Sequence, residues 1–365
     1  MKEAIRQHAR ELGFDDCRFT TGQPPQSAAR LEQWLANGQH GEMAYMERTA
    51  RKRADLQQLL PGARSIITLA VSYAPEGGGS RIEDRGAGHA ADCGARTAGF
   101  GAEATQRPGV MARFACYADY HQVLGPPLQQ LAALVNQLGG AATRSLWYVD
   151  TGSLLERDLA QRAGLGFIGK HTNLISRHLG NWIFLCEIIT TFELEPDAPE
   201  RNRCGSCTRC IAACPTAAIT APFQLDARLC ISYLTIELRG PIPANLRPSI
   251  GDRIFGCDDC LAACPWNRFA REGRLMKTHA RPHLTTLDLR ELLALDEPEF
   301  KRRFAGTPLL RARRPGLLRN VCVALGNTGD ETHLAALQSA ATNPDPIIME
   351  HAAWAIGQIQ NRRGH

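Results

Sequence analysis

The 365-residue sequence has no apolar run long enough to cross a membrane, and its first residues do not form a secretory signal. The opening segment MKEAIRQHARELGF is charged throughout and predicts an amphipathic helix. It lacks the apolar core and the small-residue cleavage site of an export signal. We therefore expect a cytoplasmic protein without membrane contacts. With 44% hydrophobic and 22% charged residues, the composition also excludes general disorder and indicates two or three globular units.

A strong net charge is also absent. The formal charge of +5 does not by itself indicate a nucleic-acid partner. The distribution is more informative, because residues 301–320 contain no acidic side chain. Their basic residues are Lys301, Arg302, Arg303, Arg311, Arg313, Arg314 and Arg319. This segment is either a phosphate-binding surface or the solvated face of a helix.

Hydrophobic patterning predicts an N-terminal α/β unit over residues 1–195. Apolar runs indicate strands at 65–71, 145–149 and 182–190, and helical periodicity indicates helices at 127–138 and 154–163. Asp150 would then end a strand, at the edge where an open α/β sheet binds its ligands. Alternatively, Asp150 caps the helix that follows. The segment 76–107, rich in Gly and Ala, predicts a surface insertion or lid.

The last 45 residues contain a weak internal repeat. The sequence Val323-Ala-Leu-Gly-Asn327 is echoed by Trp354-Ala-Ile-Gly-Gln358, at an offset of 31 residues. This offset is typical of paired helices of the HEAT type. Two copies are few, so we expect an all-α, HEAT-like unit over residues 276–365 that packs on the rest of the chain. Two unrelated amphipathic helices are the alternative.

Cysteine is abundant, with thirteen residues, and eight of them lie between positions 204 and 264. A long chain without an export signal makes metal binding a better interpretation than a disulfide scaffold. Residues 204–215 follow the bacterial ferredoxin pattern C-x2-C-x2-C-x3-C-P. A second set at 257–265 has three cysteines, and Cys230 completes the eight ligands that two clusters need.

The spacing predicts a ferredoxin-like domain with two [4Fe–4S] clusters over residues 196–275, in which each set of cysteines shares its last ligand with the other. One cluster would bind Cys204, Cys207, Cys210 and Cys264, and the other would bind Cys214, Cys230, Cys257 and Cys260. Zinc bound by four cysteines is the alternative, although the spacing is not that of a zinc ribbon. Two clusters would carry electrons from an external donor to a reaction site.

Several other motifs occur in order along the chain. They are Val149-Asp150-Thr151-Gly152, residues 162–170 (RAGLGFIGK), residues 230–237 (CISYLTIE), residues 256–260 (GCDDC) and residues 264–267 (CPWN). With the cysteine pattern, they make the chain resemble the epoxyqueuosine reductases over almost its whole length. The resemblance implies a cobalamin-dependent oxidoreductase, related to reductive dehalogenases, with an N-terminal nitroreductase-like cobalamin-binding domain. It would reduce epoxyqueuosine to queuosine in the anticodon loop of tRNA, the last step of queuosine biosynthesis.

The resemblance also implies roles for individual residues. Asp150 would donate a proton to the departing epoxide oxygen, which requires a pKa raised by burial. The cobalamin contacts would be Arg64, Arg113, Asp150, Leu155, Leu174, Leu185, Cys257 and Asp258, although a purely structural core explains the three leucines equally well. The tRNA contacts would be Lys301, Arg311, Arg313 and Arg314. Lys170 would bind the corrin or lie free on the surface, and Asp119, Tyr120 and His121 would lie near the substrate or end a strand.

Two other functions are compatible with parts of the sequence. A cobalamin-dependent reductase of a small molecule would not need the basic segment or the HEAT-like tail. A ferredoxin-like electron-transfer protein would leave the N-terminal unit of about 190 residues unexplained. The chain departs from the family in its long insertion and in lacking a glycine before Asp119-Tyr120-His121. We expect a monomer whose partners are the modified tRNA and the electron donor.

Overall fold

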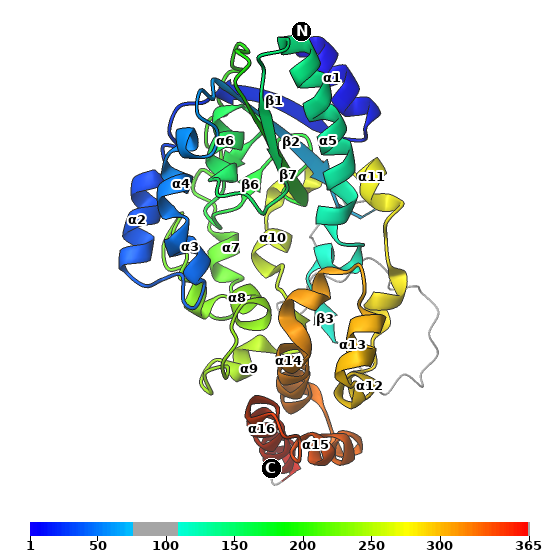
Figure 1. Cartoon of the computed structure of the whole chain (residues 1–365). Coiled ribbons are helices and arrows are strands. Elements are labelled where there is room, and N and C mark those ends of the chain that lie inside the picture. The colour runs from blue at the N-terminus through cyan, green and yellow to red at the C-terminus, as the bar shows by residue number, and fades with distance from the viewer. Residues whose placement is uncertain (76–108, 364–365) are drawn as a thin grey trace.

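The computed structural model describes residues 1–75 and 109–363 as an elongated molecule (Figure 1). The N-terminal part lies at the top of Figure 1, the cysteine-rich part in the middle and the C-terminal helices at the bottom. The insertion predicted at 76–107 lies outside the described residues. No helix in the described ranges combines the length and the apolar character that crossing a membrane requires.

A four-stranded sheet forms the centre of the N-terminal part, in the order β1-β2-β7-β4. The strands are β1 (Asp16–Thr21), β2 (Ser65–Ser72), β7 (Ile183–Thr190) and β4 (Ser145–Tyr148). All three neighbouring pairs are antiparallel. The open α/β sheet predicted from the sequence is therefore wrong in topology, and the region is α+β. Strand β2 resembles a strand of a parallel sheet in sequence because both of its faces are buried.

Helices cover both faces of this sheet. Helices α1 (Lys2–Glu11) and α5 (Tyr120–Gly139) pack on one face, in a core that includes Phe19, Ile67 and Cys186. Helix α6 (Glu156–Arg162) covers the other face, where Leu159 packs against Ile66 and Ile189. Short elements complete this part: α2 (Ala28–Ala36), α3 (Ala44–Arg48), α4 (Ala50–Ala54), β5 (Phe167–Ile168) and β6 (Leu174–Ile175).

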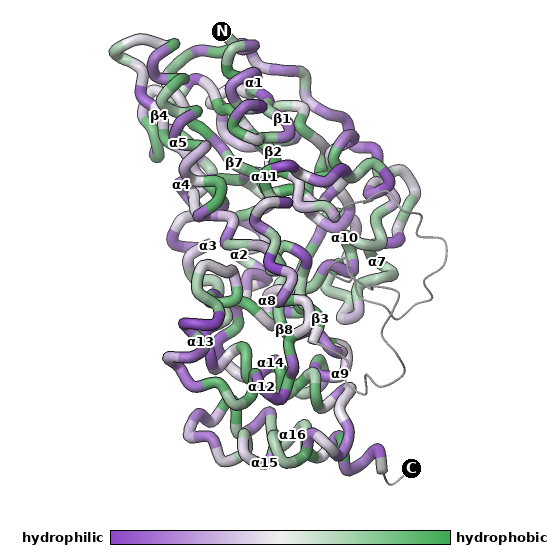
Figure 2. Tube along the Cα trace, turned by 90° about the vertical axis from the view of Figure 1, so that its right-hand side faces the viewer, coloured by the Kyte–Doolittle hydropathy of each residue, from purple (hydrophilic) through white to green (hydrophobic). Residues whose placement is uncertain are grey.

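The cysteine-rich part packs directly on the N-terminal part. Its elements are α7 (Arg209–Ala212), α8 (Ile231–Ile236), α9 (Arg247–Ile250), β8 (Arg253–Phe255), α10 (Asp259–Ala262) and α11 (Arg274–Lys277). Strand β8 pairs in parallel with β3 (Val110–Met111), and Leu261 and Met276 belong to the same core as the sheet. The N-terminal and cysteine-rich parts therefore share one core. Figure 2 shows α7 and α10 on the side of the molecule opposite to α3 and α4.

The C-terminal part consists of helices in pairs. They are α12 (Leu289–Ala294), α13 (Glu297–Arg303), α14 (Arg313–Thr328), α15 (Leu334–Ala340) and α16 (Pro346–Arg363). The two copies of the sequence repeat lie on α14 and α16, which pack against each other. A Cβ atom on Gly326 would lie 2.4 Å from the Trp354 ring, so the glycine permits this close approach. The predicted pairing of helices is confirmed.

Candidate functional site

Four cysteine thiols from two loops line one cavity of about 200 Å³. Cys204 and Cys207 come from the loop that leads into α7, Cys210 lies in the first turn of α7, and Cys264 follows α10. The structure therefore brings together the four residues that the crossed ferredoxin arrangement predicts for one cluster. We call this group the first cradle.

A partly buried lysine holds the loop of the first cradle closed. Lys170 Nζ donates hydrogen bonds to the carbonyl oxygens of Gly205 at 2.8 Å and Cys207 at 2.9 Å. Gly205 has a φ of 54°, which a residue with a side chain adopts only with strain. Lys170 thus has a structural role that neither of the two suggestions from the sequence included.

The other four cysteines gather next to α8 and α10, and we call them the second cradle. Burial raises the pKa of the Cys260 thiol well above its ordinary value, and Cys257, Cys230 and Cys214 raise it further because they lie close by. The amide of Cys257 donates to Ser232 Oγ at 3.1 Å, which fixes this loop against α8. Cys230, which lies between the two sequence motifs, therefore joins the second set in space.

The arrangement of the thiols distinguishes a cluster from a single ion. A tetrahedral zinc site needs its sulfur ligands about 2.3 Å from one centre. Within residues 1–75 and 109–363, no three Cys, His, Asp or Glu side chains converge closely enough for such an ion. The sulfurs of the first cradle instead surround a cavity of about 200 Å³. A soft four-thiolate donor set around a cavity fits an iron–sulfur cluster.

A second polar centre is built from three distant segments of the chain. The Tyr120 hydroxyl donates to Asp150 Oδ2 at 2.5 Å. Arg311 Nη1 donates to the Tyr120 oxygen at 3.1 Å and lies 3.9 Å from Asp150 Oδ2. Asp150 itself has a φ of 55°, a conformation that Asp tolerates better than most residues and that ends β4 abruptly. The carboxyl group is thus held by a phenol and faced by a guanidinium.

The environment of Asp150 differs from the prediction. Its side chain is 47% exposed, so the burial that we predicted is not observed. Capping is also wrong as an alternative, because the residue that caps α6 is Leu155. The buried member of this pair is Tyr120. Burial raises the pKa of the Tyr120 hydroxyl well above its ordinary value, and the Asp150 charge adds to this effect. The Tyr120 hydroxyl therefore stays protonated and remains a donor to Asp150.

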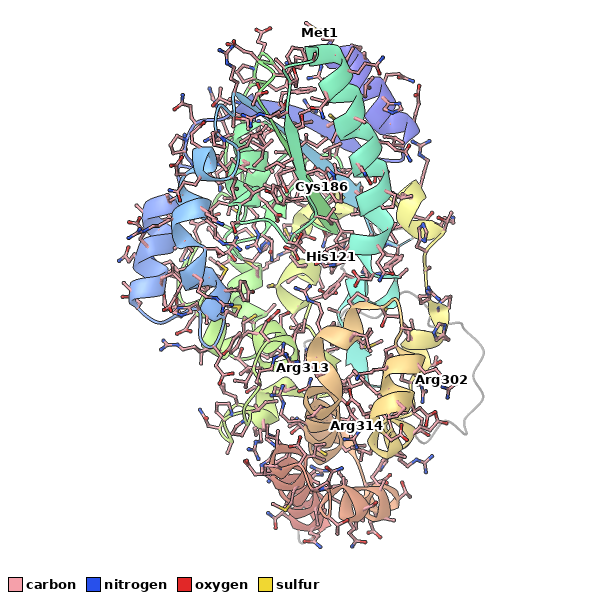
Figure 3. The ribbon with its side chains drawn as sticks, in the orientation of Figure 1. Met1, His121, Cys186, Arg302, Arg313 and Arg314 are labelled. Carbon is pink, nitrogen blue, oxygen red and sulfur yellow. The ribbon has the colours of Figure 1, made fainter. Side chains whose placement is uncertain are left out.

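The segment before α5 places Tyr120 in this centre. The Asp119 carboxylate caps the helix by accepting a hydrogen bond from the amide of His121 at 3.0 Å. These residues therefore begin a helix, and the alternative that they end a strand is wrong. Figure 3 shows His121 at the lower end of α5, above Arg313 and Arg314 at the start of α14.

Two buried carboxyl groups that we did not predict from the sequence lie behind Asp150. Glu187 pairs with Tyr148 across β7 and β4, and Glu156 begins α6. Burial, aided by the Asp150 charge, raises the pKa of Glu156 to about 8, and burial raises that of Glu187 well above its ordinary value. Glu156 Oε1 and both carboxyl oxygens of Glu187 accept no hydrogen bond from a donor among the described residues. A proton shared by the pair, or donors of a bound group, would satisfy them.

A continuous set of side chains connects the second cradle with Asp150. The amide of Arg113 donates to Asp258 Oδ2 at 2.6 Å, and its guanidinium lies 4.8 Å from the centre of the Trp182 ring. Ring contacts with centroid distances of 4.5 to 6.0 Å continue through Trp182, Tyr73, Phe184 and Tyr120. Tyr120 then reaches Asp150. Arg113, Asp258 and Cys257 therefore belong to the region between the clusters and the carboxyl group.

The three predicted leucines lie on the α6 side of the sheet. Leu174 is buried in an apolar cluster with Ala70 and Leu165, and the partly buried Leu185 packs against this cluster. Leu155 is partly buried immediately before α6. Leu174 is thus a core residue, whereas Leu155 and Leu185 retain surface that a bound group could contact.

Arg64 does not reach this region. Its backbone amide donates to Thr190 O. Thr190 lies at one end of the β4–β7 pairing, and the Glu187–Tyr148 pair near Asp150 lies at the other end. Its side chain is exposed and pairs with Glu193 at 2.9 Å. An arginine of α4, Arg53, lies on the Asp150 side instead, and its Nη1 donates to Leu154 O at 2.7 Å. Nothing in the sequence distinguishes Arg53 from its basic neighbours at 51 and 52.

The basic segment 301–320 divides into exposed and structural residues. Lys301 and Arg313 are exposed, and Lys301 lies 3.2 Å from Glu297 on the same helix. Arg314 Nε donates to Leu295 O at 2.6 Å and so anchors α14 to the end of α12. Arg319 is fully buried and donates to the carbonyl oxygens of Leu234, Leu238 and Gly240. Of the four predicted tRNA contacts, Lys301 and Arg313 are the best placed to meet a phosphate.

Family models match three successive segments of the chain. Residues 53–151 match the model described as epoxyqueuosine reductase QueG, DUF1730. Residues 203–267 match a 4Fe-4S double cluster binding domain, and residues 307–364 match HEAT repeats. An epoxyqueuosine reductase from Xanthomonas campestris pv. campestris is 42% identical over 356 residues, covering 97% of this chain and 95% of that protein. The chain belongs to the epoxyqueuosine reductase family.

Other members of the family support the same assignment. An epoxyqueuosine reductase from Escherichia coli K12 is 37% identical over 364 residues, covering 100% of this chain and 90% of that protein. A crystal structure of epoxyqueuosine reductase with an epoxyqueuosine-modified tRNA-Tyr stem loop has a TM-score of 0.83 and 33% identity, covering 98% of this chain and 90% of that chain. The resemblance inferred from the sequence is confirmed, as are the double-cluster and HEAT-type parts. Membership also argues against a simple ferredoxin-like carrier.

Proposed function

We propose that this chain reduces epoxyqueuosine to queuosine in the anticodon loop of tRNA. The observation that carries the proposal is the position of Asp150, held by Tyr120 and Arg311 and connected through Arg113 to a part that binds two [4Fe–4S] clusters. Removing an epoxide oxygen to leave an alkene and water consumes two electrons and two protons. The chain thus offers a route for electrons and a group that can donate a proton.

Asp150 is the proposed proton donor, and the bound base and cofactor would supply the burial that proton donation needs, because the chain alone leaves this side chain 47% exposed. Its exposure allows a base drawn out of the anticodon loop to reach the carboxyl group. Tyr120 fixes the orientation of the carboxyl group by donating to Oδ2 at 2.5 Å. Arg311, at 3.9 Å from the same oxygen, is placed to stabilise the carboxylate that remains after the proton has left. Proton donation and charge stabilisation are therefore supplied by different side chains.

We also infer a cobalamin site between Asp150 and the second cradle. The residues that fit it are Arg113, Leu155, Leu185, Cys257 and Asp258, with Leu174 behind them. The carboxyl oxygens of Glu156 and Glu187 that lack donors suit a cofactor whose side chains carry many amide N–H groups. Bound there, low-valent cobalt would collect single electrons for a two-electron reduction. We therefore propose a nitroreductase-like cobalamin domain at 1–195, followed by a cluster domain at 196–275 and a helical domain at 276–365.

The tRNA would lie across the C-terminal part, with Lys301 and Arg313 on its phosphates and Arg311 at the pocket. Arginine and lysine supply the charge-assisted hydrogen bonds that phosphates need. A tRNA substrate also agrees with a cytoplasmic monomer. The structure with an epoxyqueuosine-modified stem loop, which covers 98% of this chain, supports the choice of substrate.

The decisive experiment is conversion of a defined substrate. The full chain, loaded with iron, sulfide and cobalamin without oxygen and reduced with methyl viologen, is incubated with a tRNA stem loop that carries epoxyqueuosine. We expect mass spectrometry of the nucleosides to show queuosine, with one oxygen lost. Protein loaded with clusters but without cobalamin is the control and should leave the substrate unchanged. Unchanged epoxyqueuosine with fully loaded, fully reduced protein would reject the function.

A further inference from the structure

The surface beside the first cradle is hollowed and lined by arginines. The cavity of the first cradle and a neighbouring hollow of about 490 Å³ share Arg203, Trp266 and Arg268. A third hollow of about 340 Å³ adjoins the second through Arg177, His178 and Arg203. The surface thus leads without interruption from solvent to the cysteines of the first cradle.

This surface has a strong positive charge. Among the described residues that line the two outer hollows, six are arginines and only Glu200 is acidic. We call its exposed members the cluster-side arginine surface: Arg177, Arg201, Arg203, Arg268 and Arg271. Glu200 lies 3.6 Å from Arg177 and 2.9 Å from Arg203, and so neutralises only part of the charge.

Among residues 1–75 and 109–363, the rest of this surface lacks acidic partners. In the part of the chain that the structure describes, no acidic side chain forms an ion pair with Arg201, Arg268 or Arg271. The Arg268 guanidinium lies 4.6 Å from the centre of the Phe269 ring, which is 39% exposed. Exposed arginines around an exposed aromatic ring are typical of protein docking surfaces.

We propose that the cluster-side arginine surface docks an acidic one-electron carrier protein, which reduces the cluster bound by Cys204, Cys207, Cys210 and Cys264. The proposal extends the function proposed above, because the reduction of one epoxide needs two electrons and two protons from outside. Each docked carrier would give one electron and leave oxidised, so two carriers serve one turnover. Opposite charges on the two surfaces would speed their association.

The position of the surface favours a protein carrier over the tRNA. The first cradle lies at α7 and beyond α10, and Figure 2 shows these helices on the side opposite to α3, α4 and α13. Helix α13 carries Lys301, one of the proposed tRNA contacts. The second cradle abuts Arg113 through Asp258, so it lies toward the reaction site. Electrons would then pass from the first cradle to the second, while the tRNA occupies another face.

The test is a double charge reversal, Arg201→Glu with Arg271→Glu, since neither side chain lines the first cradle. The matched control is Arg30→Glu with Arg281→Glu, two exposed arginines elsewhere. Reduced flavodoxin, an acidic carrier, is mixed anaerobically with the loaded protein, and cluster reduction is followed by absorbance in a stopped-flow instrument. We expect the test variant to react at least about tenfold more slowly at low salt and with a flatter salt dependence, and the control to behave as the wild type. Binding of oxidised flavodoxin should weaken in parallel.

Three outcomes would overturn the proposal. If flavodoxin reduces the test variant at a rate within about twofold of the wild type, the carrier does not dock on this surface. An equal loss with reduced methyl viologen, a small cation, would show damage to the cluster. A loss of affinity for the tRNA stem loop with an unchanged flavodoxin rate would assign the surface to nucleic acid. Because the assay follows cluster reduction, it gives the same answer whether or not the protein converts epoxyqueuosine, so the two proposals fail separately.

Discussion

Tyr120 and Arg311 are hydrogen-bonded at 3.1 Å although 191 residues separate them in the chain. Tyr120 begins α5 in the N-terminal part, and Arg311 precedes α14 in the C-terminal part. Their contact fixes the C-terminal helices beside the Asp150 carboxyl group. A tRNA held by these helices would therefore be aligned with the group that we propose to donate the proton.

The first prediction concerns Asp150→Asn. The amide keeps the size of the side chain and can still accept from Tyr120, but it has no acidic proton to give. We expect both clusters and cobalamin to bind normally, as measured by metal content and absorbance, while turnover falls by about 100-fold or more. Turnover near that of the wild type would remove Asp150 from the mechanism.

The second prediction concerns Tyr120→Phe. The change removes the hydroxyl that donates to Asp150 at 2.5 Å and accepts from Arg311 at 3.1 Å, and it leaves the ring stacked on Phe184. Since the carboxyl group would lose its orientation, we expect kcat to fall by roughly tenfold to 100-fold and KM for the stem loop to stay within about twofold. Tyr148→Phe is the control, because Tyr148 lies on β4 near Asp150 and its hydroxyl has no partner among the described residues. Equal effects of the two changes would contradict a positioning role for Tyr120.

The sequence predicted local features well and long-range ones poorly. The strand expected at 65–71 is Ser65–Ser72, because a continuous apolar run is a local signal. Helix α5 begins seven residues earlier than the predicted 127, because capping by Asp119 outweighs the weak periodicity before Pro126. The antiparallel order of the sheet and the contact of Tyr120 with Arg311 depend on pairings across the whole chain. Neither periodicity nor spacing reports such pairings.

The cluster ligands, unlike the sheet order, could be predicted from the sequence, because the spacing of the cysteines reflects the geometry of a cluster. Short intervals bring three thiols to one loop, so the members of both cradles could be named from the sequence. The sequence does carry a signal for Glu187, because a lone carboxylate in the apolar run 182–190 has to be paired or neutral when it is buried. Its partner Glu156 lies 31 residues away and has no sequence signal of its own.

The third prediction follows from this buried pair. Between pH about 4.5 and 8 the folded protein keeps a proton on Glu156 that the unfolded chain releases. The free energy of unfolding therefore decreases as pH rises through this window, on the order of 1 kcal/mol per pH unit for each carboxyl group of the pair that stays protonated. In Glu187→Gln the amide can donate to Glu156, so we expect a shallower decrease and a higher midpoint of thermal unfolding at pH 8. The measurement uses protein freed of cobalamin.

The exposed carboxyl group of Glu193 provides the control for this prediction. Glu193→Gln makes the same substitution at the surface and should leave the pH dependence of the unfolding midpoint unchanged. If Glu187→Gln also follows the wild-type curve from pH 5 to pH 8, the buried pair does not hold the proton.

The fourth prediction tests Cys230, which the ferredoxin pattern does not include. The Cys230→Ser variant should fail to bind the cluster of the second cradle, because serine is a poor substitute for a thiolate ligand. We expect about half the iron and sulfide of the wild type after anaerobic reconstitution. Cys17→Ser, which changes a buried cysteine outside both cradles, should retain the full content. Full iron in the Cys230 variant would mean that another group completes the second cluster.

The fifth prediction concerns the binding of tRNA by the basic segment. Reversing Lys301 and Arg313 to Glu should weaken binding of the stem loop and lower the slope of log K against log salt by about one for each phosphate that is no longer neutralised. Arg314 is left unchanged, because its hydrogen bond to Leu295 O anchors α14. Replacing it could destabilise the fold, and a loss of tRNA binding would then have two explanations. Arg30→Glu with Arg281→Glu again serves as the control for charge. An unchanged slope in the Lys301 and Arg313 variant would show that the tRNA phosphates bind to another surface. The proposal that the C-terminal helices align the tRNA with Asp150 would then be wrong.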